Sequence, residues 1–229
     1  MEREPEFWED YLQDEPFCRT LKRYWWLIAW ELRFKQALFP NARLFVGKDF
    51  KWMNEYPNRK VKDPITGKSV KMYENTWEAM PWSLVDDLYR PEVDRIVRKL
   101  KAGETVESLI KKYRWIGAPI IHNIVKGPEK KGILRNVFLS KLSPGSIIRP
   151  HNGLSNDYMR VHLGLQCDPG CKITVGDVTK TWEDGKILAF KDGGPYPHSV
   201  VHNGKRDRYI MAFDLRLDYV EPYLKWQRK

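Results

Sequence analysis

The carboxy-terminal half of this 229-residue chain consists of short apolar or alternating segments that are separated by turns. The segments are residues 134–142, 147–148, 159–165, 171–175, 178–182, 187–190 and 208–217. Gly176-Asp177 and Glu183-Asp184-Gly185 are typical turn sequences between them. Short strands at a spacing of about 8–12 residues are typical of an antiparallel sandwich or barrel, and not of a parallel sheet. The pattern therefore predicts a β-rich core within residues 117–229.

The amino-terminal half is predicted to be mainly helical and to support that core. Five apolar side chains recur at three- and four-residue steps, which places them on one helical face: Phe17, Leu21, Tyr24, Ile28 and Leu32. Pro40 would close this helix, and the polar stretch 51–76 has the composition of turns. Further helices are predicted at residues 81–100 and 106–115. We therefore predict one domain over the whole chain, with residues 1–116 mainly helical.

Composition excludes several classes of protein. Hydrophobic residues make up 42% and charged residues 31% of the chain, as in globular proteins. The longest apolar run, residues 24–30, is far shorter than the ~20 residues of a membrane helix, and Met1-Glu2-Arg3-Glu4 is unlike a signal peptide. Three cysteines do not suit a disulfide scaffold. We expect a cytoplasmic protein without a membrane span. Its net charge of +10 favours anionic partners but names none of them.

Two histidines of the β-rich half are candidates for a shared metal site. His151 follows the short strand 147–148, and His198 lies 47 residues later (198 − 151). A small barrel brings strand ends together at its mouth, where neutral imidazoles can converge on a metal ion. Two loop histidines without a shared role are an equally good interpretation of the spacing alone.

Charged residues on two predicted strands suggest an anion site beside these histidines. Arg160 and His162 alternate with Val161 and Leu163, so they face the interior if the apolar side packs against the helical half. Arg208 opens the last strand and could also face inward. A buried guanidinium requires an anion, and its planar fork matches a carboxylate. Two such arginines beside two histidines would suit a dicarboxylate on a metal, whereas a surface salt bridge is the simpler interpretation of each arginine by itself.

The blocks around these residues resemble the aspartyl/asparaginyl β-hydroxylase family in order and spacing. They are residues 140–153 (SKLSPGSIIRPHNG), 160–165 (RVHLGL), 171–173, 181–186 (TWEDGK), His198 and 208–214 (RYIMAFD). The resemblance covers about residues 117–220. It implies an Fe(II)- and 2-oxoglutarate-dependent oxygenase with a double-stranded β-helix (jelly-roll, cupin-like) core packed against helices.

The resemblance also implies the metal ligands. His151 and His198 would be the catalytic iron ligands. Most oxygenases of this fold add a carboxylate two residues after the first histidine, but this chain has Gly153 there, as in the two-histidine site of the family. Asp157 lies nearby, and we do not assign it as a ligand. Related halogenases also lack the carboxylate, so Gly153 by itself does not establish hydroxylation.

Four further residues are implied to bind the cosubstrate or to line the site. Arg208, ten residues after the second histidine, would pair with the distal carboxylate of 2-oxoglutarate, and Ser140 would add a hydroxyl there. Arg160 and His162 would line the site near the metal, where they would hold cosubstrate or a substrate carboxylate. Lys191 replaces the first residue of an acidic pair that the family usually carries, which leaves the substrate open.

The expected activity is hydroxylation of an unactivated C–H bond in an amino-acid, peptide or related acidic substrate. 2-Oxoglutarate would be decarboxylated to succinate and CO2, with Fe(II), 2-oxoglutarate and O2 as cofactor and cosubstrates. A halogenase and an acyl-chain hydroxylase are the alternatives within this chemistry. Another alternative is a basic nucleic-acid-binding module formed by the segments 59–71 and 126–131. No nucleic-acid-binding motif accompanies those segments, so we do not expect a nucleic-acid partner.

Overall fold

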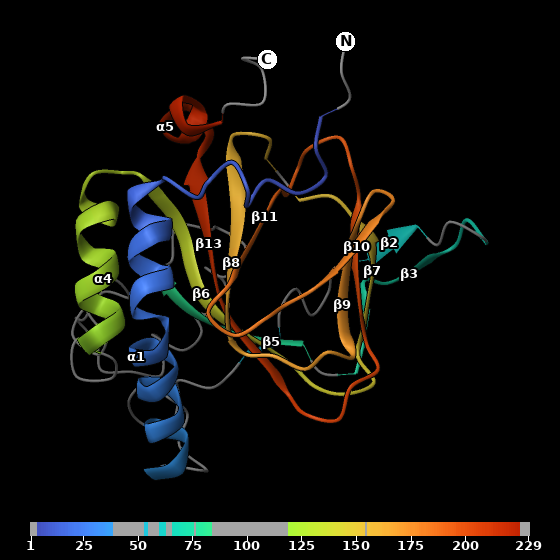
Figure 1. The fold of residues 1–229 in the computed structure, drawn as a ribbon. Coiled ribbons are helices and arrows are strands. Elements are labelled where there is room, and N and C mark those ends of the chain that lie inside the picture. Colours follow the sequence, from blue (N-terminus) through green and yellow to red (C-terminus); the bar gives the residue numbers. More distant parts are fainter. Residues whose placement is uncertain are drawn as a thin grey trace, which may run out of the picture.

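The computed structural model describes residues 4–38, 53–54, 60–62, 66–75, 77–83, 119–153 and 155–224. The predicted helices at 91–100 and 106–115, and Pro40, lie outside these residues. Within the described part, antiparallel strands form most of the structure and two helices flank one side of it (Figure 1).

The strands of the described residues form two main antiparallel sheets and a small ribbon. The six-stranded sheet has the order β1-β5-β6-β13-β8-β11, with bounds β1 Met53–Asn54, β5 Trp77–Ser83, β6 Leu134–Leu142, β13 Arg208–Arg216, β8 Tyr158–Gln166 and β11 Ile187–Lys191. The five-stranded sheet has the order β10-β9-β12-β7-β4, with bounds β10 Val178–Thr181, β9 Cys171–Val175, β12 His198–His202, β7 Ile147–His151 and β4 Tyr73–Glu74. The ribbon pairs β2 Lys60–Lys62 with β3 Ser69–Lys71.

The strand order confirms the predicted fold. The inner strands β6-β13-β8-β11 face β10-β9-β12-β7, and consecutive strands from β6 to β13 alternate between the two sheets, apart from the hairpin of β9 and β10 within the five-stranded sheet. Eight antiparallel strands that alternate in this way form a double-stranded β-helix, or jelly roll.

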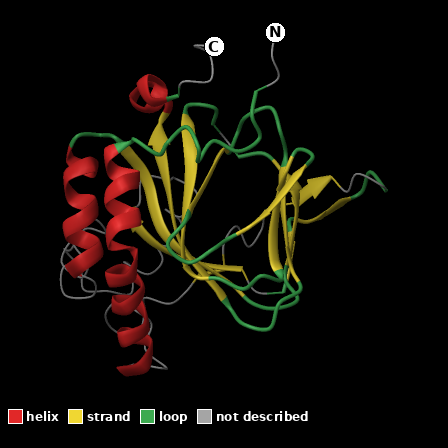
Figure 2. Cartoon of the chain, in the orientation of Figure 1, coloured by secondary structure: helices red, strands yellow, loops and turns green. Residues whose placement is uncertain are grey.

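Two helices cover the outer face of the six-stranded sheet (Figure 2). Helix α1 is Pro16–Leu38 and helix α4 is Pro119–Lys130. The Glu15 carboxylate accepts the backbone N–H groups of Phe17 and Cys18, which caps α1. The buried Glu31 of α1 accepts the first N–H groups of α4, from Ile120 and Ile121. One carboxylate of α1 therefore both caps α4 and fixes it against α1. The chain ends its described part with α5 (Leu217–Val220) and the short 3-10 helix η1 (Glu221–Tyr223).

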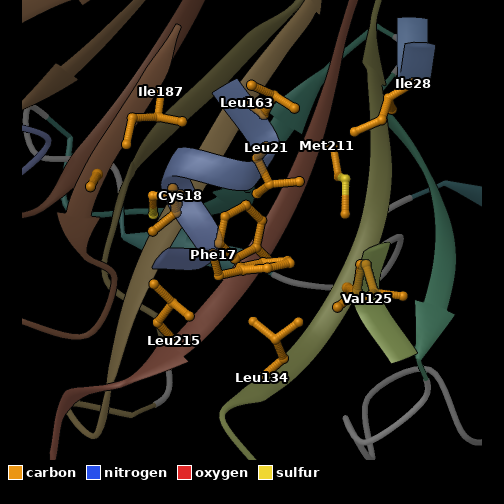
Figure 3. Close-up of a cluster of buried hydrophobic side chains, with 14 of the residues drawn as sticks. Phe17, Cys18, Leu21, Ile28, Val125, Leu134, Leu163, Ile187, Met211 and Leu215 are labelled. Atoms are coloured by element: carbon orange, nitrogen blue, oxygen red, sulfur yellow. The ribbon is translucent and has the colours of Figure 1, made fainter. Parts of the chain in front are cut away.

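One hydrophobic cluster joins α1 and α4 to the sheet (Figure 3). Phe17, Leu21 and Ile28 of α1 contribute one side of it, and Met211 and Leu215 of β13 contribute the other. The rings of Phe17 and Phe213 pack edge to face, with centroids 5.1 Å apart.

Side chains of β8 alternate between this cluster and the interior of the jelly roll. Met159, Val161, Leu163 and Leu165 belong to the cluster beneath the helices. The residues between them, Arg160 and His162, point to the other face of the sheet because side chains alternate along a strand. The predicted inward orientation of both residues is therefore confirmed.

Some predictions for the amino-terminal half are wrong. Pro81 and Ser83, expected to begin a helix, lie in β5, which pairs with β6 and belongs to the jelly-roll sheet. Strands β1 and β4 likewise add residues from this half to the two sheets. Conversely, α4 lies within the segment 117–229 that was assigned to the β core. Tyr24, placed on the buried face of the first helix, is 37% exposed.

Among the described residues, none of the helices combines the length and the apolar composition that crossing a bilayer requires.

Candidate active site

A pocket lies between the two sheets, with about 540 Å³ of empty space when the open solvent at its mouth is included. All six residues predicted for the site line it: Ser140, His151, Arg160, His162, His198 and Arg208. The two histidines predicted to bind metal come from the five-stranded sheet, and the other four residues come from the six-stranded sheet. The fold thus brings together residues that are up to 68 positions apart in the sequence.

His151 and His198 meet because their strands pair. His151 ends β7, His198 begins β12, and the two are direct partners in the antiparallel register. Their ring centroids lie 4.2 Å apart. Nδ1 of His151 lies 2.7 Å from the carbonyl oxygen of Arg149, so this nitrogen carries the proton and Nε2 keeps its lone pair for a metal ion.

The two imidazoles are the candidate metal ligands of this pocket. No group of three or more His, Cys, Asp or Glu side chains that could hold a metal ion occurs in the described part of the chain. Asp157, near the first histidine in sequence, accepts a hydrogen bond from Ser155 and does not line the pocket. The arrangement matches the two-imidazole donor set that the sequence resemblance implies.

The Asp192 carboxylate fills the space that Gly153 leaves. A Cβ built on Gly153 would overlap this carboxylate, and the Gly153 N–H donates to the Asp192 carbonyl oxygen at 2.7 Å. Asp192 Oδ1 lies 3.4 Å from Nε2 of His198, and Oδ2 lies 3.4 Å from the Arg160 guanidinium. A carboxylate therefore stands beside the histidine pair, although it comes from the end of β11 and not from the position after His151.

Arg160 is held by two acidic side chains of the protein. Its guanidinium makes a two-point contact with the buried Asp214 and lies near Asp192. Asn136 donates a further hydrogen bond of 2.9 Å to Asp214. Arg160 is thus fixed on the pocket wall and orients Asp192. Its predicted role toward a cosubstrate or substrate carboxylate stays a prediction.

Arg208 has a different environment. It is buried, with 3% of its surface exposed, and Nη2 donates to the Ser140 hydroxyl at 3.0 Å. Its guanidinium lies 4.7 Å from the centre of the Trp182 ring. Trp77 Nε1 donates to the same Ser140 oxygen at 3.2 Å, which orients the hydroxyl. A buried guanidinium that lines the pocket can form a charged pair with an anionic ligand group.

His162 is neutral in the folded protein. Burial lowers its pKa well below the ordinary value, and the positive charges of Arg160 and Arg208 and the proximity of His198 act in the same direction. Trp182 Nε1 donates to His162 Nδ1 at 3.2 Å, so the proton of the imidazole is on Nε2. His162 can therefore offer one N–H donor to a group in the pocket without adding charge.

Comparison with known proteins shows which family this part of the chain resembles. The model of the family "Aspartyl/Asparaginyl beta-hydroxylase" matches residues 114–217, which include all the pocket residues discussed above except Trp77. Residues 114–217 are therefore similar to the aspartyl/asparaginyl β-hydroxylase family. The resemblance inferred from the sequence is therefore confirmed.

Two relatives of the aspartyl/asparaginyl β-hydroxylase family illustrate the match. The human protein "Aspartyl/asparaginyl beta-hydroxylase" is 38% identical over 102 residues, which is 43% of this chain and 13% of that protein. The mouse "Aspartate beta-hydroxylase domain-containing protein 2" is 35% identical over 86 residues, 36% of this chain and 24% of that protein. The match thus spans less than a quarter of each relative's length. Among solved structures, a Pseudomonas putida prolyl-4-hydroxylase aligns over 85% of this chain and 86% of its own, with 12% identity and a TM-score of 0.41.

Two acidic residues of this site were not predicted. Asp192 has the stronger sequence signal, because it stands in the second place of the acidic pair that the family usually carries before the second histidine. Asp214 closes the last matched block, but nothing local to the sequence pairs it with Arg160. The basic segments considered for nucleic acid lie on the β2–β3 ribbon and at the end of α4 where they are described.

The packing of Gly153 against Asp192 predicts a stability effect. We expect Gly153→Ala to lower the free energy of unfolding by about 1–3 kcal/mol, because the new methyl group displaces the carboxylate from its contacts. Urea unfolding of Gly153→Ala, Asp192→Ala and the double variant measures the coupling. Gly153→Ala should lower the free energy of unfolding less in the Asp192→Ala background than in the wild type. Strictly additive effects would contradict the overlap.

The low pKa of His162 predicts a pH effect on stability. The unfolded chain binds a proton near pH 6.5, whereas the folded chain does not. The neutral His162 therefore makes its full contribution to the free energy of unfolding above about pH 6.5. This contribution is lost as the pH falls below about 6.5, by at most about 1.4 kcal/mol per pH unit. His162→Gln should flatten the dependence of the free energy of unfolding between pH 7 and pH 5. Burial also lowers the pKa of His202, so part of the slope should persist. An unchanged slope would show that His162 is protonated in the folded state.

Proposed function

We propose that this chain is an Fe(II)- and 2-oxoglutarate-dependent hydroxylase that acts on an unactivated C–H bond of an amino-acid, peptide or related acidic substrate. One observation carries the proposal: His151 and His198 are register partners with ring centroids 4.2 Å apart, in a pocket that also holds a buried arginine. Two imidazoles and a guanidinium match a metal ion and a diacid.

The donor groups fit Fe(II). His151 presents Nε2, because its Nδ1 is bound to a backbone carbonyl, and His198 lies against it on the neighbouring strand. Imidazole nitrogen is a suitable ligand for iron, and the hydrogen bond to Arg149 is the kind of outer contact that fixes a ligand's tautomer. His151 and His198 would therefore hold the metal, and the adjacent Asp192 carboxylate adds negative charge beside it.

The chain's own residues position the cosubstrate and exclude water. Arg208 and Ser140 would bind the distal carboxylate of 2-oxoglutarate on the wall formed by β6 and β13. The rings of Trp182 and Phe190 line the same pocket, so the charged pair would form away from bulk water, where it is strong. When bound, Fe(II) and 2-oxoglutarate supply the oxidation of a C–H bond by O2, coupled to formation of succinate and CO2.

The position of Asp192 favours hydroxylation over halogenation. A halide at the metal would require the space that a missing carboxylate leaves beside Gly153. In this chain the Asp192 carboxylate occupies that space, and two like charges in contact repel each other. Adding chloride to the reaction should therefore yield no halogenated product.

The proposal is tested on the purified chain in two steps. Adding Fe(II) and then 2-oxoglutarate without oxygen should produce the visible charge-transfer absorption of a chelated 2-oxo acid. Admitting O2 should then release succinate, and a panel of aspartyl, asparaginyl and free amino-acid substrates identifies the one that gains an oxygen atom by mass spectrometry. A chain that shows neither the absorption nor succinate, but shifts an oligonucleotide in a salt-sensitive way, would be a binding module and not an oxygenase.

A further inference from the structure

The solvent-facing side of α1 carries large aromatic side chains that the core does not use. Trp26, Trp30 and Phe34 follow one another at four-residue steps and are 54%, 55% and 46% exposed. The rings of Trp30 and Phe34 are stacked, with centroids 5.0 Å apart. The opposite side of the helix supplies the apolar contacts to the sheet, through Leu21 and Ile28. The three rings therefore form a separate apolar surface.

Basic side chains share this face of the helix. Arg19, Lys22, Arg23 and Arg33 fall with the three aromatic residues within about 120° of arc, at about 100° per residue. We call these seven residues the α1 stripe. The acidic residue of α1 is Glu31, which is buried and caps α4.

The positive charge of the stripe is only slightly offset by its neighbours. Arg33 lies 3.8 Å from the exposed Asp184 of a turn, which is a weak surface contact. Lys22 donates to the neutral Gln13, and the Arg23 guanidinium lies over the Tyr24 ring. The stripe therefore combines a net positive charge with exposed rings.

We propose that the α1 stripe docks this protein on the surface of an anionic phospholipid bilayer. Tryptophan prefers the headgroup level of a bilayer, because its ring is apolar and its N–H is polar. Arginine and lysine are attracted to anionic lipids, and their long stems let the charge reach the headgroups while the rings insert. A helix with both features lies in the plane of the interface.

The geometry favours lipid over nucleic acid. Bases bind to separate aromatic platforms inside a basic groove, whereas Trp30 and Phe34 stack on each other on the exposed side of α1. The active-site pocket lies on the other face of the six-stranded sheet, so docking leaves it unblocked. The proposal does not depend on the proposed hydroxylase activity.

Vesicle co-sedimentation of the full chain tests the proposal. The protein should sediment with large vesicles of phosphatidylcholine mixed with phosphatidylglycerol, and weakly with phosphatidylcholine alone. Trp26→Ala/Trp30→Ala/Phe34→Ala should lower the partition coefficient by at least about tenfold. Arg19→Gln/Arg23→Gln should lower it on the anionic vesicles only, and the loss should be smaller at high salt.

Matched controls come from other exposed residues. Val178→Ala/Val201→Ala removes apolar side chains that are 37% and 39% exposed, and Lys130→Gln/Lys131→Gln removes two charges at the end of α4. Both should bind vesicles like the wild type. Melting curves check the fold, and the single variant Trp30→Ala replaces the triple variant if the latter is unstable.

Three outcomes would overturn the proposal. The first is equal vesicle binding by all variants, or binding by none. The second is a dimer in size-exclusion chromatography that the triple aromatic variant dissolves, which would assign the stripe to a second copy of the chain. The third is an oligonucleotide complex that the same variant abolishes while vesicles do not bind.

Discussion

Replacing His198 by alanine is expected to remove metal binding, and with it all turnover. His151 and His198 are the paired imidazoles of the pocket, so the variant keeps one of the two proposed ligands. Changes in residues that merely support a ligand already cost 10–100-fold in metal affinity, so losing one of two ligands should cost more than about 100-fold. Calorimetric titration of the metal-free chain with Co(II) or Fe(II) measures the loss without requiring a substrate.

A second histidine of the same strand provides the matched control. His202 is also buried in β12, but its Nε2 lies 2.8 Å from the Arg206 carbonyl oxygen, and it does not line the pocket. His202→Ala should lower the free energy of unfolding and keep the metal affinity. His151→Ala should reproduce the loss seen with His198→Ala. Full metal occupancy in either ligand variant would show that the pair is not the metal site.

Most strands of the jelly-roll core were predictable because they are apolar or alternating segments between turns, although β12 was not predicted and β7 was predicted only at residues 147–148. Strands β6 and β9 have the bounds expected from the sequence, and β8, β10, β11 and β13 differ by one or two residues at their ends. Strands β6, β8, β11 and β13 have one face in the cluster beneath the helices and the other face toward the interior of the jelly roll, so their side chains alternate along the chain.

Strands whose existence depends on distant partners were not predictable. The segment 77–83 contains Pro81, which usually argues against a strand, yet it pairs with β6 and accommodates a register shift between Pro81 and Ser83. Helix α4 is short and carries Gly127-Pro128, and its first N–H groups are satisfied by Glu31, about 90 positions away. Such long-range contacts leave no periodic signal in the local sequence.

The same reasoning explains what was missed in the site. His151 and Arg208 stand out because both residue types are unusual on otherwise apolar strands. The Asp192 carboxylate lies beside the histidines because Gly153, 39 positions earlier (192 − 153), has no side chain and because the Arg160 guanidinium attracts it. Which carboxylate fills a gap is decided by tertiary packing, so Asp157, the nearer residue in sequence, lies elsewhere.

Replacing Arg208 by alanine is expected to weaken binding of 2-oxoglutarate by about 100-fold or more, with little change in metal affinity. The guanidinium is buried and fixed by Ser140 and Trp182, so its orientation toward a ligand carboxylate costs little entropy on binding. A charged pair formed in such a dry site is worth several kcal/mol, and truncating one partner loses it. Anaerobic titration of the Fe(II)-loaded chain with 2-oxoglutarate measures the dissociation constant, and Co(II) titration measures metal affinity separately.

Two further variants separate carboxylate recognition from general effects of charge. Arg208→Lys keeps a positive charge but loses the planar fork, so it should recover only part of the affinity. Arg206→Ala removes a neighbouring arginine whose side chain is 65% exposed, and it should bind 2-oxoglutarate like the wild type. If Arg208→Ala binds 2-oxoglutarate with unchanged affinity while remaining folded, the part of the pocket formed by Arg208 and Ser140 binds another ligand. In that case the two histidines would be left without their proposed cosubstrate.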